Sequence, residues 1–192
     1  IALDPGHGKT TPGKRSPASL GQPIVMEYAF NRSVVKALTT LLKKRNITVV
    51  NLAPTDVDTT LGARCKAANA AGAKILISIH ANAGGGTGIE TYYQPGSKKG
   101  QRLARLIQED LVNATDMRDR GTKDHRTVKS GGKTIDQALY MTKVPESYGI
   151  TAVLTELGFM DHANDIVKLR SATYIATCAK AIDAAIARYL GI

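Results

Sequence analysis

The chain alternates short apolar, strand-like runs with stretches of helical periodicity, and this alternation constrains its fold more than any other feature. The strand-like runs are IALD (1–4), ITVVNL (47–52), KILISIH (74–80), GIETYYQ (88–94) and TAVLTE (151–156). Helical patterns occupy residues 27–45, 58–71, 97–113 and 171–190. Alternating strands and helices favour a parallel sheet covered by helices. We therefore predict an α/β fold: a single domain with a mostly parallel, twisted central sheet and helices on both of its faces.

The length of 192 residues is typical of one domain with a sizeable core. Because the sequence begins at Ile1 rather than Met, we expect a piece of a longer chain. Its longest apolar runs are too short to span a bilayer. The stretch 114–150 has no clear pattern, apart from a loop expected at Gly131-Gly132.

The composition is strongly basic, with 26 Lys and Arg against 16 Asp and Glu and a net charge of +10. Such a charge favours polyanionic partners: nucleic acid, an anionic membrane or an anionic cell wall. The chain has no Trp and two Phe, so no aromatic platform for nucleic-acid bases is evident. Cys65 and Cys178 lie in separate predicted helices, and we expect two buried free thiols.

Three predicted buried strands end in a polar residue of a type that is unusual in a buried strand: His7, His80 and Glu156. The carboxyl ends of parallel strands meet at one edge of a sheet, where ligands of α/β proteins bind. A fourth group, Glu27, opens the first predicted helix after a loop at 9–23. We therefore expect these four side chains to converge on one rim.

Two His and one Glu are a known ligand set for catalytic zinc. His7, Glu27 and His80 lie far apart in the sequence, however, and match no compact zinc motif. From the residues alone, His7 could be a turn residue and Glu27 a helix first-turn anion. Glu156 is harder to explain without a partner, because burying an unpaired carboxylate is costly. His125 and His162 are expected at the surface.

The stretch HANAGGGTG (80–88) also favours a ligand site, because consecutive glycines let the backbone approach a ligand closely. A phosphate-binding loop is the competing interpretation. It is disfavoured because no Lys-Ser/Thr pair follows and the next element has a strand pattern.

Four blocks together resemble one family: LDPGHG (3–8) with Glu27 after it, ARCKAANAAGA (63–73), ISIHANA (77–83) and AVLTELGFM (152–160). They are similar to zinc-dependent N-acetylmuramoyl-L-alanine amidases, which include bacterial autolysins and the catalytic domains of phage endolysins. The resemblance spans the whole chain, with the blocks in family order.

The resemblance implies Zn²⁺ as cofactor, with His7, Glu27 and His80 as its ligands and Glu156 as the catalytic glutamate. It implies peptidoglycan hydrolysis at the amide between the lactyl group of N-acetylmuramic acid and L-alanine of the stem peptide. A zinc-activated water would attack, with Glu156 as general base and then general acid. Asp4 is expected either to orient His7 or to form a turn with Pro5 and Gly6.

Supporting roles are implied for Arg64, Asn69 and Asn82, with a plain surface ion pair as the alternative for Arg64. The chain departs from the family in starting its last strand with Ile-Thr, where many relatives have Pro-Ala. Its loop at 9–23 is rich in Lys, Arg and Pro, which could reshape the substrate groove. Some cell-division relatives carry a long helix over the site, but 122–150 is too short and too Gly-rich for one. We therefore expect an open site.

The resemblance also bears on the protein's setting. Residues 1–192 would be one catalytic domain whose wall-binding module lies elsewhere in the parent chain. Expected partners are peptidoglycan and anionic wall polymers, with no nucleic acid and no membrane insertion, and we expect a monomer. The protein would be secreted or wall-associated, or phage-encoded and delivered to the wall. Two alternatives stay open: a zinc hydrolase of another amide, and a non-enzymatic basic module that binds wall or nucleic acid.

Overall fold

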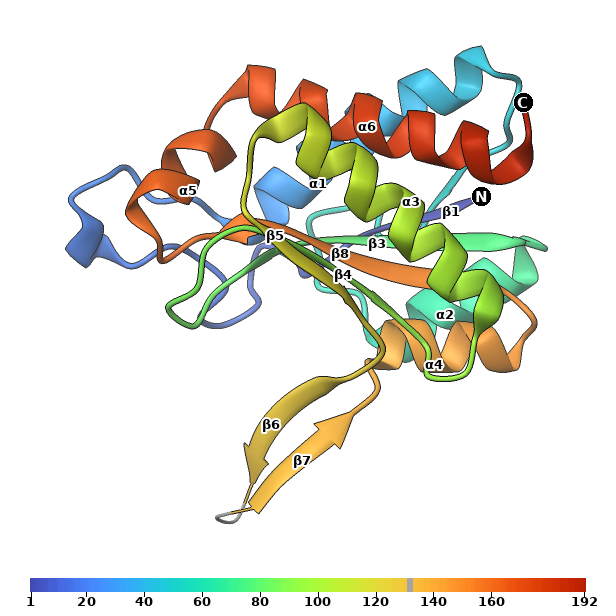
Figure 1. Ribbon diagram of the computed structural model, residues 1–192, viewed down its shortest axis with the longest axis horizontal. Coiled ribbons are helices and arrows are strands. Elements are labelled where there is room, and N and C mark those ends of the chain that lie inside the picture. The colour runs from blue at the N-terminus through green and yellow to red at the C-terminus, as the bar shows by residue number, and fades with distance from the viewer. Residues whose placement is uncertain (131–132) are drawn as a thin grey trace.

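A six-stranded sheet forms the centre of the fold in the computed structural model, which describes residues 1–130 and 133–192 (Figure 1). In sheet order, its strands are β2 (Val50–Asn51), β1 (Ala2–Pro5), β3 (Ile75–Asn82), β8 (Thr151–Phe159), β4 (Ile89–Tyr93) and β5 (Asp119–Lys123). Strands β4 and β8 pair antiparallel, whereas the other neighbours in this sheet run parallel. The predicted fold class is confirmed.

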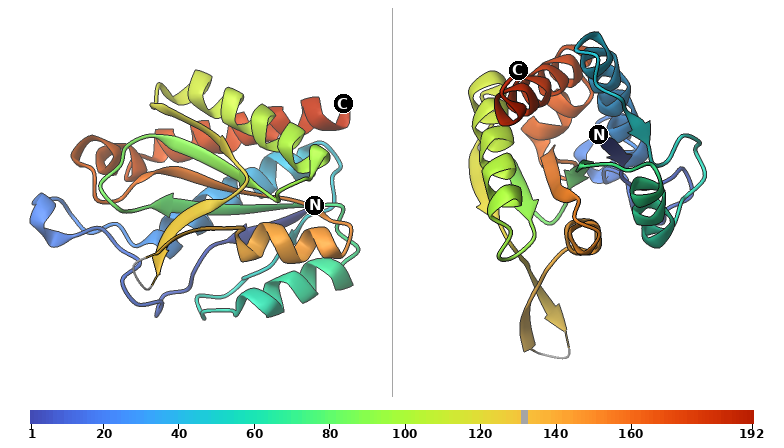
Figure 2. Two further views of the ribbon diagram at one scale, coloured as in Figure 1. Left: turned by 60° about the horizontal axis from the view of Figure 1, so that its bottom comes forward. Right: turned by 90° about the vertical axis from the view of Figure 1, so that its right-hand side faces the viewer.

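Helices cover both faces of this sheet (Figures 1 and 2). One face carries α1 (Glu27–Lys44), α3 (Lys98–Thr115) and α6 (Ala172–Leu190), and both α1 and α3 pack against α6. The other face carries α2 (Leu61–Ala70) and α4 (Tyr140–Ser147), which contact each other. The short helix α5 (Ala163–Leu169) follows β8. Each face thus has its own apolar core.

The first helix shows how sequence pattern sets this packing. Its apolar side chains Phe30, Val34, Leu38 and Leu42 recur every four residues, and all are buried. This spacing places them on one side of an α-helix, toward the sheet. Capping then sets the helix starts: the side chains of Thr60, Ser97 and Ser171 accept hydrogen bonds from the first turns of α2, α3 and α6.

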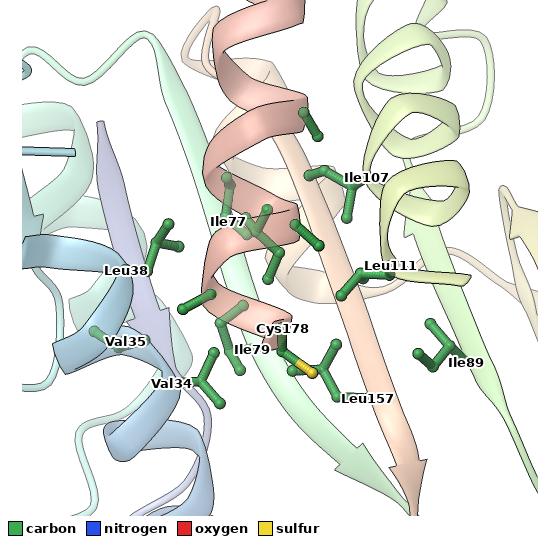
Figure 3. Close-up of a cluster of buried hydrophobic side chains, with 14 of the residues drawn as sticks. Val34, Val35, Leu38, Ile77, Ile79, Ile89, Ile107, Leu111, Leu157 and Cys178 are labelled. Atoms are coloured by element: carbon green, nitrogen blue, oxygen red, sulfur yellow. The ribbon is translucent and has the colours of Figure 1, made fainter. Parts of the chain in front are cut away.

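The larger core lies between the sheet and helices α1, α3 and α6 (Figure 3). Helix α1 contributes Val34 and Leu38, β3 contributes Ile77 and Ile79, and Cys178 of α6 lies among them. The side chains drawn in the close-up are apolar and mostly branched, which suits close packing between a pleated sheet and helices. This packing fixes the orientation of β3 and so of its polar face.

Alternate residues along a strand point to opposite faces of the sheet, so odd and even positions in one strand face different helix layers. Ile75, Ile77 and Ile79 belong to the larger core, whereas Leu76 belongs to the core beneath α2 and α4. Ser78 and His80 therefore share the face of Leu76. The same alternation in β1, β8 and β4 places further polar residues on that face: Asp4, Glu156 and Glu90.

The structure shifts several predicted boundaries. The strand expected at 47–52 is reduced to Val50–Asn51, because this edge strand pairs with β1 only as far as Leu3 opposite Asn51. The helix expected at 58–71 begins at Leu61, after the cap at Thr60. Strands β3 and β8 continue past His80 and Glu156, which are therefore inside strands rather than at their ends.

The unpatterned stretch 114–150 contains β5, a hairpin and α4. The hairpin pairs β6 (Arg126–Ser130) with β7 (Lys133–Gln137) and extends away from the sheet (Figure 1). The loop expected at Gly131-Gly132 lies outside the described residues. Within the described part of this stretch, the one helix after α3 is the eight-residue α4, so no long helix covers the site there.

Cys65 and Cys178 are both buried and free, as expected. Burial raises the pKa of Cys65 to about 11 and that of Cys178 to about 12, so both stay protonated thiols at neutral pH. Among the described helices, none has the length and apolar character needed to cross a membrane.

Candidate metal centre

A close backbone approach positions His7 at the end of β1. The residue has a left-handed backbone with φ of 64°, and Gly6 before it donates from its amide to the Ile79 carbonyl at 3.0 Å. A Cβ on Gly6 would lie 2.1 Å from Cε1 of His80. The glycine therefore lets the His80 ring lie directly against the turn that presents His7. The two rings meet edge to face, with centroids 4.9 Å apart.

Glu27 lies between the two histidines. It is the first residue of α1 and is almost fully buried. Its Oε1 atom is 3.1 Å from Nδ1 of His80 and 3.4 Å from Nε2 of His7. Its Oε2 atom is 4.0 Å from Nζ of Lys14, which belongs to the loop at 9–23. The loop expected to shape the groove thus reaches this site.

The three side chains meet the requirements of a divalent metal. One ligand atom from each of His7, Glu27 and His80 lies within 4.8 Å of the other two. Among the described residues, Oε2 of Glu27 and Oε2 of Glu156 are buried without a hydrogen-bond partner. Buried carboxylate oxygens are costly unless paired, and a cation would supply that partner. Two imidazoles and a carboxylate are the donor set of catalytic zinc.

The electrostatics of the cluster reflect this crowding of ligands. Burial alone would raise the pKa of Glu27, but hydrogen bonds from His7 and His80 outweigh it and the pKa falls well below its usual range. Burial alone would lower the pKa of His80, but the hydrogen bond to Glu27 and the charge of Glu156 raise it. Glu27 and the two histidines are therefore strongly coupled within one buried cluster.

Glu156 lies beside this cluster on the neighbouring strand. It is opposite His80 in the β3–β8 ladder and opposite Glu90 in the β4–β8 ladder. Burial raises the pKa of Glu156 to about 7, His80 opposes that shift, and the charges of Glu27 and Glu90 add to it. A carboxyl group with such a pKa can both accept and donate a proton near neutral pH.

Arg64 is a buried residue of α2, with 1% of its surface exposed, so the alternative of a surface ion pair is wrong. Its Nη1 atom is 2.5 Å from Oδ1 of Asp4. Asp4 is likewise buried and belongs to β1, so it is a strand residue rather than a turn residue. Its other oxygen accepts from Ser78 at 2.6 Å. These bonds link Asp4 to Arg64 and to Ser78 of β3, the strand that also carries His80. Neither bond links Asp4 to the side chain of His7.

The other two supporting candidates, Asn82 and Asn69, lie in different parts of the structure. Asn82 lines the cleft and donates from Nδ2 to Oε1 of Glu90 at 2.8 Å. Asn69 is exposed near the end of α2, and it is not one of the described residues that line the cleft. Its supporting role stays a prediction.

Sequence reasoning missed Ser78 and Glu90. Glu90 is buried, and its carboxylate accepts from Tyr92, Asn82, Arg120 and Lys123. Burial alone would raise the pKa of Glu90, but Lys123 and Arg120 lower it. Ser78 lies two positions before His80, and Glu90 lies two positions before Tyr92. Residues two apart on a strand share a face, and this spacing was the sequence signal that could have revealed them.

One cleft of about 810 Å³ is lined by the site residues His7, Glu27, His80, Asn82, Glu90 and Glu156. Its walls come from the loop after β1, the ends of β3 and β8, β5, the base of the hairpin and the start of α4. His125 has an exposed side chain, as expected, but it lies in this wall. His162 is partly exposed and caps α5, outside the cleft lining described here.

The glycine-rich loop serves the protein rather than a phosphate. The amides of Gly84 and Gly85 both donate to Oδ2 of Asp161, at 2.7 and 2.8 Å. A Cβ on Gly86 would lie 2.5 Å from the Phe159 ring. The predicted approach at this loop was to a ligand, whereas the structure shows a close approach to Phe159 of β8, the strand that carries Glu156. The next element is strand β4, which argues against a phosphate loop.

Comparison with known proteins gives a consistent result. A family model described as N-acetylmuramoyl-L-alanine amidase matches residues 1–188. The chain is 33% identical over 183 residues to the N-acetylmuramoyl-L-alanine amidase CwlM of Bacillus licheniformis, covering 94% of this chain and 64% of that protein. It is 27% identical over 197 residues to an endolysin of Bacillus phage SPP1, covering 100% of this chain and 66% of the endolysin.

A solved structure agrees with the sequence matches. The crystal structure of an N-acetylmuramoyl-L-alanine amidase from Clostridium difficile 630 has a TM-score of 0.82 and 28% identity to this chain, covering 99% of this chain and 95% of that one. The chain spans 64% of the length of two of its Bacillus relatives. Because the family model extends over nearly all of its residues, the chain belongs to the N-acetylmuramoyl-L-alanine amidase family.

Proposed function

We propose that this chain hydrolyses the amide between the lactyl group of N-acetylmuramic acid and L-alanine of the peptidoglycan stem peptide. The observation that carries this proposal is the convergence of His7, Glu27 and His80 beside Glu156, in one cleft of a chain that belongs to the amidase family. The relatives named as amidases and as an endolysin support the same substrate class.

Zn²⁺ is the proposed cofactor. His7, Glu27 and His80 would hold it through two ring nitrogens and a carboxylate, and the unpartnered buried oxygens beside them favour a cation there. Bound zinc lowers the pKa of a water ligand and polarises a carbonyl group. The protein's own part is to keep three ligands in separate elements at one point, through the close packing at Gly6.

Glu156 is the proposed proton carrier. Its carboxylate takes a proton from the attacking water and returns it to the leaving nitrogen of L-alanine. Because an amide nitrogen leaves poorly unless protonated, the second transfer matters as much as the first. A pKa of about 7 suits both transfers. The cleft is large enough for a glycopeptide segment, at about 810 Å³.

The proposed setting is the bacterial cell wall. We propose that residues 1–192 form a single catalytic domain that acts as a monomer, with peptidoglycan as substrate and anionic wall polymers as secondary ligands. A separate wall-binding module is consistent with the greater length of CwlM. The protein would be secreted or wall-associated, or delivered to the wall as a phage lysin.

Digestion of purified peptidoglycan tests the reaction. We expect mass spectrometry to find new α-amino groups on L-alanine and newly freed lactyl carboxylates on muramic acid. New amino groups further along the stem peptide would instead indicate a hydrolase of another amide. Wall binding without any released ends would indicate a basic binding module.

Removal of metal tests the cofactor. Chelation is expected to abolish digestion, and added Zn²⁺ is expected to restore it, because the proposed nucleophile depends on the ion. Digestion that continues at full rate after metal has been removed, as verified by elemental analysis, would contradict the zinc site.

A further inference from the structure

A buried chain of polar groups runs from α2 to His80. Arg64 donates from Nη1 to Oδ1 of Asp4 at 2.5 Å. Oδ2 of Asp4 accepts from Oγ of Ser78 at 2.6 Å. Oγ of Ser78 is 3.1 Å from Nε2 of His80. Arg64, Asp4 and Ser78 are each at most 1% exposed, so water does not compete for these bonds.

The hydrogen-bonding capacity of these groups gives the chain one direction. Arg64 can only donate, and an ionised Asp4 can only accept. The Ser78 hydroxyl hydrogen is therefore committed to Asp4, which leaves the Ser78 oxygen as an acceptor. Nε2 of His80 must then be the donor in the last bond. Once a cation takes the place of the Nδ1 proton that faces Glu27, the remaining ring proton is on Nε2.

The opposite ring nitrogen is the one that faces the cluster. Nδ1 of His80 lies 3.1 Å from Oε1 of Glu27, on the side where His7 also points. A nitrogen ligates a metal through its lone pair, so Nδ1 must be unprotonated when an ion is bound. The buried chain supplies this condition from the far side of the ring.

We propose that Ser78, Asp4 and Arg64 are positioning residues that set the ligating tautomer of His80, with the proton on Nε2 and the lone pair on Nδ1. This inference rests on the proposed function, because it takes His80 to be a zinc ligand. Arg64 adds a second constraint, since it also donates to the carbonyls of Pro5 and His7 at 2.7 and 3.2 Å. One guanidinium thus holds the turn that carries His7 and orients His80.

Ser78→Ala tests the chain with the least disturbance. It removes the acceptor of the Nε2 proton but no charge. Loss of a second hydrogen bond to a metal-bound His weakens metal binding about 10- to 100-fold, and we expect a loss of this size in Zn²⁺ affinity, measured by competition with a chromophoric chelator. Ser78→Thr keeps the hydroxyl and is expected to recover most of the affinity.

A matched control separates this effect from general damage to the sheet. Thr155→Val removes a different fully buried hydroxyl, in the neighbouring strand β8, which accepts from Thr91 at 3.2 Å. We expect it to leave Zn²⁺ affinity at the parent value. Thermal unfolding of the metal-free proteins reports any loss of fold in each variant.

Asp4→Asn provides a test of direction. Arg64 would hold the amide oxygen, which turns the amide NH₂ toward Ser78 and reverses the polarity of its hydroxyl. The proton of His80 is then driven to Nδ1, so we expect a larger loss of Zn²⁺ affinity than in Ser78→Ala.

Substitution with Co²⁺ allows an NMR measurement on His80 that does not depend on the stability of the fold. In the Co²⁺ form, the hyperfine-shifted proton NMR signal of Nε2–H of His80 is expected in the parent protein and in Thr155→Val. In Ser78→Ala, we expect this signal to broaden through faster solvent exchange, because its acceptor is gone.

The outcomes distinguish this inference from the proposed function. If the parent binds Zn²⁺ and releases L-alanine amino groups, while Ser78→Ala keeps the parent Zn²⁺ affinity and a slowly exchanging Nε2 proton, the positioning role is refuted and the function stands. If the parent itself binds no Zn²⁺, the function fails first. A Ser78→Ala loss that Ser78→Thr does not recover, with both variants folded, would also contradict the role of the hydroxyl.

Discussion

At the scale of single residues, the proposed chemistry depends on a difference in pKa between two neighbouring carboxyl groups, those of Glu27 and Glu156. Glu27 is surrounded by His7 and His80, and its pKa is held low. Glu156 has the same ordinary acidity, but its burial raises its pKa to about 7. One carboxylate is therefore suited to stay charged and bind a cation, and the other to exchange a proton.

Glu156→Gln is expected to preserve Zn²⁺ binding and remove most turnover. The amide matches the carboxylate in size but cannot accept a proton. We expect kcat to fall about 10²- to 10⁴-fold, with Zn²⁺ content unchanged, as measured by elemental analysis of the purified variant. Near-parent turnover in a fully loaded variant would remove Glu156 from its proposed role.

The pH dependence of hydrolysis should carry the signature of the same group. A proton acceptor must be ionised, so kcat/KM is expected to fall as pH decreases through the pKa of Glu156. A nearby bound cation favours the carboxylate, which places the acidic limb at or below about pH 7. Rates on a soluble muramoyl peptide across the acid and neutral range measure this limb. A midpoint above pH 7 would disagree with the assignment.

At the scale of elements, the site depends on how closely the turn after β1 packs on β3. A Cβ on Gly6 would lie within 2.1–2.6 Å of three atoms of the His80 ring. Neither the ring nor the backbone can retreat far, because β1 and β3 are paired along Ala2–Pro5. The glycine is thus part of the ligand geometry even though it has no side chain.

Gly6→Ala is expected to displace His80 and weaken Zn²⁺ binding about 10- to 100-fold, as for other losses of ligand orientation. Gly62→Ala in α2 is the matched control, because its Cβ would make an ordinary contact at 3.5 Å from the Tyr140 hydroxyl. That control is expected to gain about 0.5–1 kcal/mol of stability. Chelator competition and thermal unfolding compare the two. Equal Zn²⁺ affinities would show that the close approach is dispensable.

The elements also show how far sequence could predict this site. Strand endings pointed to His7, His80 and Glu156, since apolar runs show where strands lie and parallel strands end together. Glu27 was likewise predicted to lie with them, but the pairing of β8 with β4 could not be predicted, because the sheet order places β8 between β3 and β4 through long-range pairing. That order brings Glu90 opposite Glu156, and no local pattern encodes it.

The hairpin illustrates the same limit. The sequence of residues 126–137 lacks alternating apolar positions, and the hairpin of β6 and β7 extends away from the sheet. Hydrophobic periodicity arises where one face of an element packs on a core, so a segment that extends away from the sheet gives a weak signal. The sequence therefore did not reveal the cleft wall formed by Lys123, His125 and Arg126, which only the structure shows.

At the scale of the whole molecule, the net charge of +10 should govern how the protein reaches its substrate. A surface of this sign attracts anionic polymers at long range, and salt screens that attraction. We expect retention on purified cell walls to fall with increasing NaCl, as measured by co-sedimentation. Hydrolysis of a small, uncharged muramoyl peptide should change little over the same range. Wall retention that is insensitive to salt would show that the charge does not contribute.

The central position of β8 has a consequence for the order in which a newly made chain can become active. Strands β3 and β4 are adjacent in sequence but lie on either side of β8, which follows them by more than half the distance to the carboxyl end. On the ribosome, the three side chains proposed to bind metal emerge before β8, and the position between β3 and β4 stays unfilled until Thr151–Phe159 has been synthesised. The same strand fills the sheet and carries Glu156, so chains that end before Thr151 have neither a closed sheet nor the carboxyl group proposed as proton carrier.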